Sequence, residues 1–207
     1  TRTPRTAVGL VNPQWEKLRG SKPEVEELFE GEQEREEWLE SARALVRRYF
    51  ELENPGSLEP QDKEMRLQVS LPTGLRLRGY VDRLDVAPGG QIRVVDYKTG
   101  KSPHPRFEDK AKFQIFFYAV MIWRDLGVVP TRLQLVYLGG NGAVRWYDPT
   151  EEELRAAESE ISDIWARIEE AGRTGRWAPR PSKLCGWCEH QALCPEFGGT
   201  PPPLPTG

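Results

Sequence analysis

Two carboxylates lie in neighbouring apolar segments of this 207-residue chain, in a pattern that could hold a metal ion. Asp82 occurs in GYVDRLD, and Asp96 occurs two residues before Lys98 in VVDYKTG. A short turn joins the two segments, so we expect antiparallel strands with Asp82 roughly opposite Asp96. Adjacent carboxylates repel each other unless a cation such as Mg²⁺ or Mn²⁺ lies between them. The two segments therefore predict a divalent-cation site.

Lys98 adds an amine to the same place, because residues i and i+2 share one face of a strand. It could orient or deprotonate a metal-bound water, or stabilise developing negative charge. The alternative is a solvated strand end, with an Asp96–Lys98 ion pair that contributes less than about 1 kcal/mol.

A polar pair lies in the apolar segment KFQIFFYAVMI, which is typical of a buried helix. Gln114 and Tyr118 are four residues apart and share one face of that helix. A buried Gln needs a hydrogen-bond partner, which could be the strand that carries Asp96 or a phosphate group. A partly exposed polar stripe is the alternative.

All three cysteines of the chain, Cys185, Cys188 and Cys194, lie in LCGWCEHQALC. This number and spacing suit a metal site in a reducing compartment better than a disulfide framework, and the short loops should bring the thiolates together. With His190 they could form a Cys₃His zinc site, although His190 is only two residues from Cys188. Free thiols are the remaining alternative.

The elements that would position these residues follow from hydrophobic periodicity and turn residues. We expect an irregular segment at 1–20, a helix at 23–52, three strands at 64–72, 74–86 and 92–100, a helix at 108–127, a hairpin at 132–148, a helix at 149–171 and an extended polyproline tail at 201–205. This order predicts a mixed α/β fold with strands flanked by helices.

Composition limits the partners. The net charge of −3 gives no general attraction to nucleic acid, so any basic surface must be local. Basic residues do gather in two places, which could contact phosphates or simply maintain solubility. They are Lys98, Lys101, Arg106, Lys110 and Lys112 around the proposed site, and Arg173, Arg176, Arg180 and Lys183 before the cysteines. No apolar run approaches the ~20 residues of a membrane helix, and no secretory signal is present.

Together, GYVDRLD, VVDYKTGK and QIFFY resemble the RecB-family nuclease domain of the PD-(D/E)XK superfamily. That family's pattern reads G-x-x-D-R-x-D, D-x-K-T-G and Q-x-x-x-Y. The resemblance covers residues 64–197 and is closest to actinobacterial RecB-like exonucleases. It implies a restriction-endonuclease-like α/β core whose mixed central sheet, a three-strand meander followed by a helix and further strands, is flanked by helices.

The same resemblance assigns roles to individual residues. It implies that Asp82, Asp96 and the backbone carbonyl of Tyr97 bind the catalytic metal, and that Lys98 is the catalytic lysine. Gln114 and Tyr118 would support the site and the DNA backbone. Glu64 matches a recurrent family Glu, to which the sequence assigns no role.

Similar family members hold a [4Fe-4S] cluster with one distant N-terminal Cys and three C-terminal ones, here Cys185, Cys188 and Cys194. They also place a metal-site His in an N-terminal helix. This chain has only three Cys, and its two His are His104 and His190. We expect that an N-terminal part of the protein, absent from this chain, supplies the missing residues.

The sequence therefore predicts a cytoplasmic Mg²⁺- or Mn²⁺-dependent DNA exonuclease of repair or recombination. We expect no membrane association, and we expect DNA and other repair or helicase proteins as partners. The expected regions are a helical region at 1–60, the nuclease core at 61–172 and the cysteine segment with its tail at 173–207. Expected DNA contacts are Lys101, Lys112 and Arg176. The alternatives are a catalytically inactive DNA-binding module of a repair complex and a zinc-stabilised interaction domain.

Overall fold

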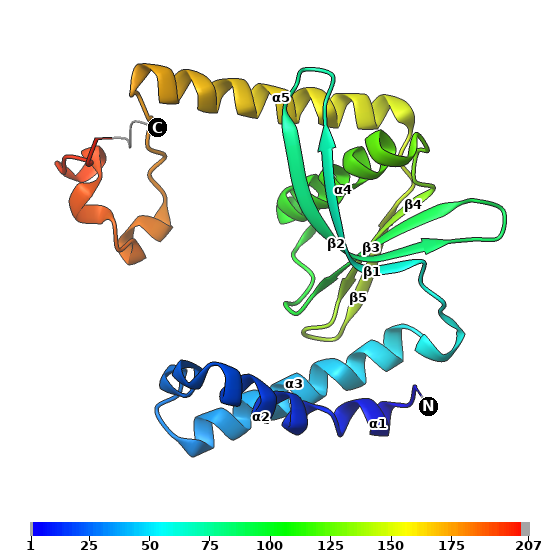
Figure 1. The fold of residues 1–207 in the computed structure, drawn as a ribbon. Coiled ribbons are helices and arrows are strands. Elements are labelled where there is room, and N and C mark those ends of the chain that lie inside the picture. Colours follow the sequence, from blue (N-terminus) through cyan, green and yellow to red (C-terminus); the bar gives the residue numbers. More distant parts are fainter. Residues whose placement is uncertain (1, 204–207) are drawn as a thin grey trace. The chain divides into compact units, whose positions relative to one another are not determined.

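The computed structural model describes residues 2–203 (Figure 1). The chain divides into two compact units, Thr1–Glu158 and Ser159–Gly207. Helix α5 (Glu151–Thr174) runs across the boundary between them. Residues 204 and 205 of the expected polyproline tail lie outside the described residues. Among the helices of the described part, none combines the length and hydrophobicity that a membrane span requires.

The first unit is built on a five-stranded sheet in the order β1-β2-β3-β4-β5 (Figure 1). The strands are β1 (Asp62–Ser70), β2 (Arg76–Val86), β3 (Ile92–Lys98), β4 (Arg132–Tyr137) and β5 (Ala143–Tyr147). The pairing of β3 with β4 is parallel, and the other three pairings are antiparallel. Helix α4 (Asp109–Leu126) lies in the connection that a parallel pair requires. The predicted mixed α/β fold, with its meander, helix and hairpin, is confirmed.

Helix α4 packs against the sheet with a largely apolar surface. Ile115, Val120 and Ile122 have no exposed surface, and neither do Val94 of β3 and Leu133 of β4. The helix ends at Gly127, whose φ of 71° is the left-handed conformation that favours glycine at this position. An ion pair from Arg124 to Glu158, with Nη2 and Oε1 2.7 Å apart, joins α4 to the first half of α5.

The N-terminal region differs from its prediction in two ways. Residues 1–20, expected to be irregular, contain helices α1 (Pro4–Val8) and α2 (Val11–Ser21). Pro4 and Pro13 each lie in the first turn of a helix, where their missing N–H would have no partner in any case. The single helix expected at 23–52 is a 3₁₀ segment (Pro23–Leu28) and helix α3 (Glu32–Leu52), since the backbone is extended at Phe29 and Gly31.

The C-terminal region has little regular structure beyond α5. That helix begins at Glu151 rather than Pro149, because Thr150 and Glu153 form reciprocal caps: Thr150 N donates to Glu153 Oε2 at 2.9 Å, and Glu153 N donates to Thr150 Oγ1 at 3.2 Å. Three 3₁₀ turns follow it, at Lys183–Trp187, Gln191–Leu193 and Pro195–Phe197. Short 3₁₀ turns also occur at Pro55–Ser57 and Pro105–Phe107.

Candidate active site

The end of β3 and the middle of α4 are joined by a chain of polar contacts. Lys98 Nζ lies 2.7 Å from Asp96 Oδ2 and donates a hydrogen bond of 2.6 Å to Gln114 Oε1. Gln114 Nε2 in turn donates to the hydroxyl of Tyr118 at 3.0 Å. The four residues Asp96, Lys98, Gln114 and Tyr118 thus form a chain in which each side chain contacts the next. The two-residue spacing on β3 and the four-residue spacing on α4 bring each pair together as expected.

Asp82 lies on the neighbouring strand. The ladder between β2 and β3 pairs Arg83 with Val95, and one further step in this register sets Asp82 against Asp96. Asp82 Oδ2 accepts a hydrogen bond of 2.7 Å from the backbone N–H of Tyr97. Both carboxylates and the Tyr97 peptide therefore occupy one short stretch of two paired strands.

The charges at this site favour a cation. Asp96 is 3% exposed, and burial raises the pKa of its carboxyl. The charge of Asp82 raises this pKa further, and only the contact with Lys98 opposes the shift. Asp96 Oδ2 is also a buried atom without a hydrogen-bond partner among the described residues, although Lys98 is paired with it electrostatically. A buried carboxylate in this state gains from a bound cation.

The donor set fits a magnesium-type ion. The described residues contain no group of three or more His, Cys, Asp or Glu side chains that could hold a metal. Mg²⁺, however, usually takes only one or two protein carboxylates and completes its shell with substrate phosphates and water. Asp82, Asp96 and the carbonyl of Tyr97 could supply that share. A redox metal that needs a full protein cage would not fit here.

Glu64 lies near Asp82 with an unusual backbone. Its φ of 51° is the only positive value of a non-glycine residue in the described chain, and such backbones are often kept at functional sites. Glu64 falls between two residues that pair with Arg83 and Val81, so it lies across from Asp82. Both also line a cavity of about 840 Å³. The structure thus gives Glu64 a place beside the site.

A buried polar cluster that was not predicted from the sequence lies behind the two carboxylates. Glu53 accepts hydrogen bonds from Arg83 Nη1 at 2.8 Å and from the Tyr97 hydroxyl at 2.8 Å. Gln134 of β4 adds a third partner at 3.1 Å. The burial of Arg83 could have been predicted from the sequence, because alternation along the strand places Arg83 on the opposite face from Asp82. Glu53 carries no such signal, since it lies in the predicted break after a helix.

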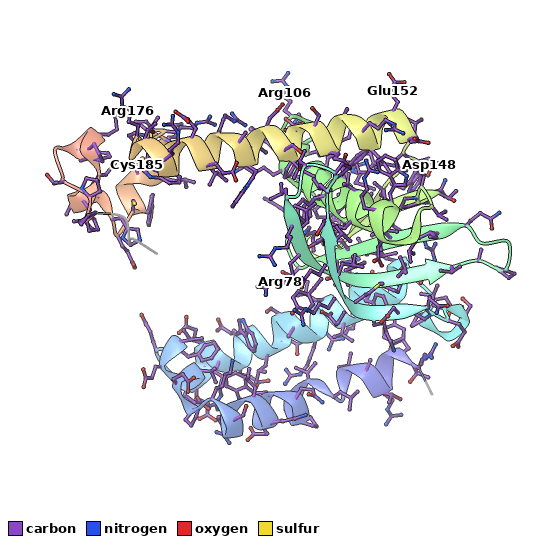
Figure 2. The ribbon with its side chains drawn as sticks, turned by 45° about the horizontal axis from the view of Figure 1, so that its top comes forward. Arg78, Arg106, Asp148, Glu152, Arg176 and Cys185 are labelled. Carbon is purple, nitrogen blue, oxygen red and sulfur yellow. The ribbon has the colours of Figure 1, made fainter. Side chains whose placement is uncertain are left out.

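The predicted DNA contacts are spread over both units. Lys112 lies on α4 two residues before Gln114, and its ammonium is 5.3 Å from the Phe116 ring centroid. Lys101 is exposed in the segment after β3. Arg176 is exposed in the second unit, in the same segment as Cys185 (Figure 2). Arg106, labelled in the same view, lies in the 3₁₀ turn before α4.

The cysteine prediction does not agree with the structure. Cys188 is exposed, and Cys185 and Cys194 are half-buried free thiols. Within residues 2–203 they form no group with each other or with His190 that could hold a metal. The backbone N–H of Ser182 instead donates to Cys185 Sγ at 3.2 Å. The short loops therefore do not suffice to bring the thiolates together, and the residues as arranged fit neither an iron–sulfur cluster nor zinc.

The sheet order, the crossover helix and the D-x-K pair on a paired strand define the restriction-endonuclease-like class of α/β folds. The sequence model of the PD-(D/E)XK nuclease superfamily matches residues 5–195, and the chain belongs to this superfamily.

Two curated relatives are similar to part of the chain. The gene 69 protein of Mycobacterium phage L5 is 28% identical over 130 residues, which cover 60% of this chain and 41% of that protein. The gene 69 protein of Mycobacterium phage D29 is 29% identical over 140 residues, which cover 65% and 48%. The chain thus spans less than half the length of these relatives.

A solved structure shares the fold. The crystal structure named "Putative exonuclease" from Eubacterium rectale has a TM-score of 0.50 and covers 91% of this chain and 80% of its own. The sequence identity is 13%, so the likeness supports the fold alone.

Proposed function

We propose that this chain is a Mg²⁺- or Mn²⁺-dependent deoxyribonuclease of the RecB type, an exonuclease that hydrolyses phosphodiester bonds in DNA repair or recombination. Membership of the nuclease superfamily supports the general class. The observation that carries the proposal is the succession Asp96–Lys98–Gln114, with Asp82 one register step away on β2. DNA is the proposed substrate, with other repair or helicase proteins as partners.

Asp82, Asp96 and the Tyr97 carbonyl would hold the divalent ion. When bound, such an ion neutralises phosphate charge and lowers the pKa of a water. Lys98 is held by two oxygens, so its ammonium has a fixed position beside Asp96. From there it can orient the attacking water or stabilise charge that develops on the phosphate.

Gln114 and Tyr118 act through Lys98. Because the amide nitrogen of Gln114 donates to Tyr118, its oxygen is turned toward the Lys98 ammonium. Lys101, Lys112 and Arg176 would contact phosphates, which positions the strand without reading its sequence.

One observation favours a second candidate, an inactive DNA-binding module. Similar family members have a His in the metal site, and His104 does not take that role. It is exposed, and its Nδ1 accepts a hydrogen bond of 3.3 Å from Arg106 N, so it makes no contact with Asp96 or Lys98. The zinc-stabilised interaction domain has no support from the cysteine geometry. For the same reason the proposed mechanism uses no [4Fe-4S] cluster, which remains a hypothesis from sequence resemblance.

The test is cleavage of end-labelled single- and double-stranded DNA with Mg²⁺, Mn²⁺ or EDTA. The wild-type chain should release labelled products only with metal, and Asp96→Ala should abolish this release. Asp125→Ala, an exposed carboxylate at the far end of α4, is the matched control and should keep activity. Undiminished cleavage by the Asp96→Ala protein would refute the proposed site. DNA binding without cleavage in any metal would favour the inactive module.

A further inference from the structure

Glu53 receives four hydrogen bonds although it lies outside every recognised motif. Arg83 donates to both of its oxygens, with Nη1 2.8 Å from Oε2 and Nη2 2.9 Å from Oε1. The Tyr97 hydroxyl donates to Oε2 at 2.8 Å, and Gln134 Nε2 donates to Oε1 at 3.1 Å. The side chains of Glu53 and Arg83 are only 8% and 4% exposed. This carboxylate is therefore saturated and its position is fixed.

The four residues of this cluster belong to four parts of the first unit. Glu53 follows directly after α3, Arg83 lies in β2, Tyr97 in β3 and Gln134 in β4. The cluster also extends along β2, because Arg83 Nε lies 3.1 Å from Asp85 Oδ1. One carboxylate thus ties the end of a helix to three neighbouring strands.

Two members of the cluster adjoin the proposed metal ligands along the chain. Arg83 follows Asp82, and Tyr97 follows Asp96. Tyr97 is itself the proposed carbonyl ligand, and its N–H holds Asp82 Oδ2 at 2.7 Å. A rotation of the Tyr97 residue would therefore move its carbonyl and release Asp82 at the same time.

The hydroxyl of Tyr97 is suited to prevent that rotation. It donates to Glu53 Oε2 at 2.8 Å, so the residue is held at the end of its side chain as well as at its backbone N–H. Glu53 is held in turn by both terminal nitrogens of Arg83, so the acceptor of this hydrogen bond has a fixed position. Buried ion pairs of this kind add little net stability on average. Their clearest effect is to fix geometry, as partners behind metal ligands do.

We propose that Glu53 is a positioning residue for the metal site, which clamps Arg83 and the Tyr97 hydroxyl so that Asp82 and the Tyr97 carbonyl are preset for a divalent cation. The inference rests on the proposed metal-dependent nuclease function. It names a role for residues on the side of the sheet away from the reacting groups.

The experiment measures Mn²⁺ binding to the DNA-free chain by isothermal titration calorimetry. Tyr97→Phe removes one hydroxyl, and Glu53→Gln weakens the same clamp from the other side. Each should raise the Kd for Mn²⁺ about tenfold, the lower end of what partners behind metal ligands contribute. Tyr80→Phe and Glu51→Gln are exposed neighbours on β2 and α3 and should leave the Kd unchanged. Circular dichroism at 25 °C must show equal folded content, and Tyr97→Phe keeps the test valid if Glu53→Gln does not fold.

A lower Tm with an unchanged Kd would overturn the inference, because it would show that the clamp only holds α3 to the sheet. In that case wild-type cleavage persists and the proposed function stands. If the wild-type chain neither binds Mn²⁺ more tightly than Asp96→Ala nor cleaves DNA, the proposed function fails, and the inference fails with it.

Discussion

At the scale of single residues, the position of the Lys98 ammonium depends on two oxygens from different elements. Asp96 Oδ2 belongs to the same strand, and Gln114 Oε1 belongs to α4. The pairing with Asp96 could be predicted from the i, i+2 spacing, and the sequence also required some partner for Gln114. The identity of that partner depends on how α4 packs on the sheet, which the sequence alone does not determine.

We predict that Gln114→Ala lowers the rate of metal-dependent cleavage about 10- to 100-fold, because Lys98 loses the acceptor that fixes it. The Tm should change by only a few degrees, since Lys98 keeps its contact with Asp96. Single-turnover cleavage and differential scanning fluorimetry measure the two effects. Gln68→Ala, an exposed glutamine on β1, is the control. Equal rates for Gln114→Ala and wild type would show that the glutamine has no role in the reaction.

A second residue-scale prediction concerns Asp96, whose pKa burial raises above its usual 3.8. The folded state then binds this proton more tightly than the unfolded state, so stability falls as the pH rises from about 3.8 through the raised value. Asp96→Asn removes this penalty. In EDTA at pH 7 its Tm should equal or exceed that of wild type, by about 2–4 °C for each kcal/mol relieved.

The difference should shrink as the pH falls below 4, where the wild-type carboxyl is protonated in both states. Thermal melts from pH 3 to pH 8 check this course. A Tm at pH 7 well below wild type would mean that the ion pair with Lys98 outweighs the cost of burial.

At the scale of elements, the strands and α4 followed from their patterns, and the N-terminal helices did not. Alternating apolar residues predicted β1, of which Leu67 and Val69 are buried, and Gly127 predicted the end of α4. Residues 1–20 were expected to be irregular, whereas Pro4 and Pro13 each occupy the first turn of a helix. Glu53 could not be predicted, because its partners come from three strands distant in the sequence.

Gly139 shows how closely two elements meet beside the site. A Cβ at this position would lie 2.6 Å from the carbonyl carbon of Gly100 and 2.6 Å from the carbonyl oxygen of Thr99. Both are backbone atoms, so no side-chain rotation can relieve the contact. The same approach is fixed by hydrogen bonds from Leu138 N to Lys98 O at 2.8 Å and from Gly139 N to Gly100 O at 3.2 Å.

We therefore predict that Gly139→Ala displaces the segment that follows Lys98 and lowers stability by about 1–3 kcal/mol, as overpacking does. Cleavage should fall even at temperatures where the protein is folded. Gly20→Ala is the control, because a Cβ there meets nothing within 4 Å and alanine favours the helix. Urea unfolding and cleavage assays test both variants. An alanine at 139 that changes neither would contradict the close approach.

At the scale of the whole molecule, the family match extends from residue 5 to residue 195 and so includes the cysteine segment as well as the sheet. The sequence pattern favoured a metal cluster there because three thiols lie within one short segment. The structure shows why spacing was insufficient. Cys185 lies within the first 3₁₀ turn and Cys188 directly follows it, whereas Cys194 lies between the second and third turns, so the local backbone sets the direction of each side chain separately.

The last prediction follows from this arrangement. Three thiols that form no common group lack the four thiolates that an iron–sulfur cluster usually needs. Protein made anaerobically from this chain should contain iron, sulfide and zinc well below one equivalent. Cys188→Ser should change neither metal content nor Tm, because Cys188 is exposed and no metal-binding energy would be lost. Metal analysis, visible absorption and thermal melts check these outcomes. About four iron atoms per chain, lost in Cys188→Ser, would restore the [4Fe-4S] hypothesis, whereas stoichiometric zinc lost in the same variant would restore the Cys₃His site.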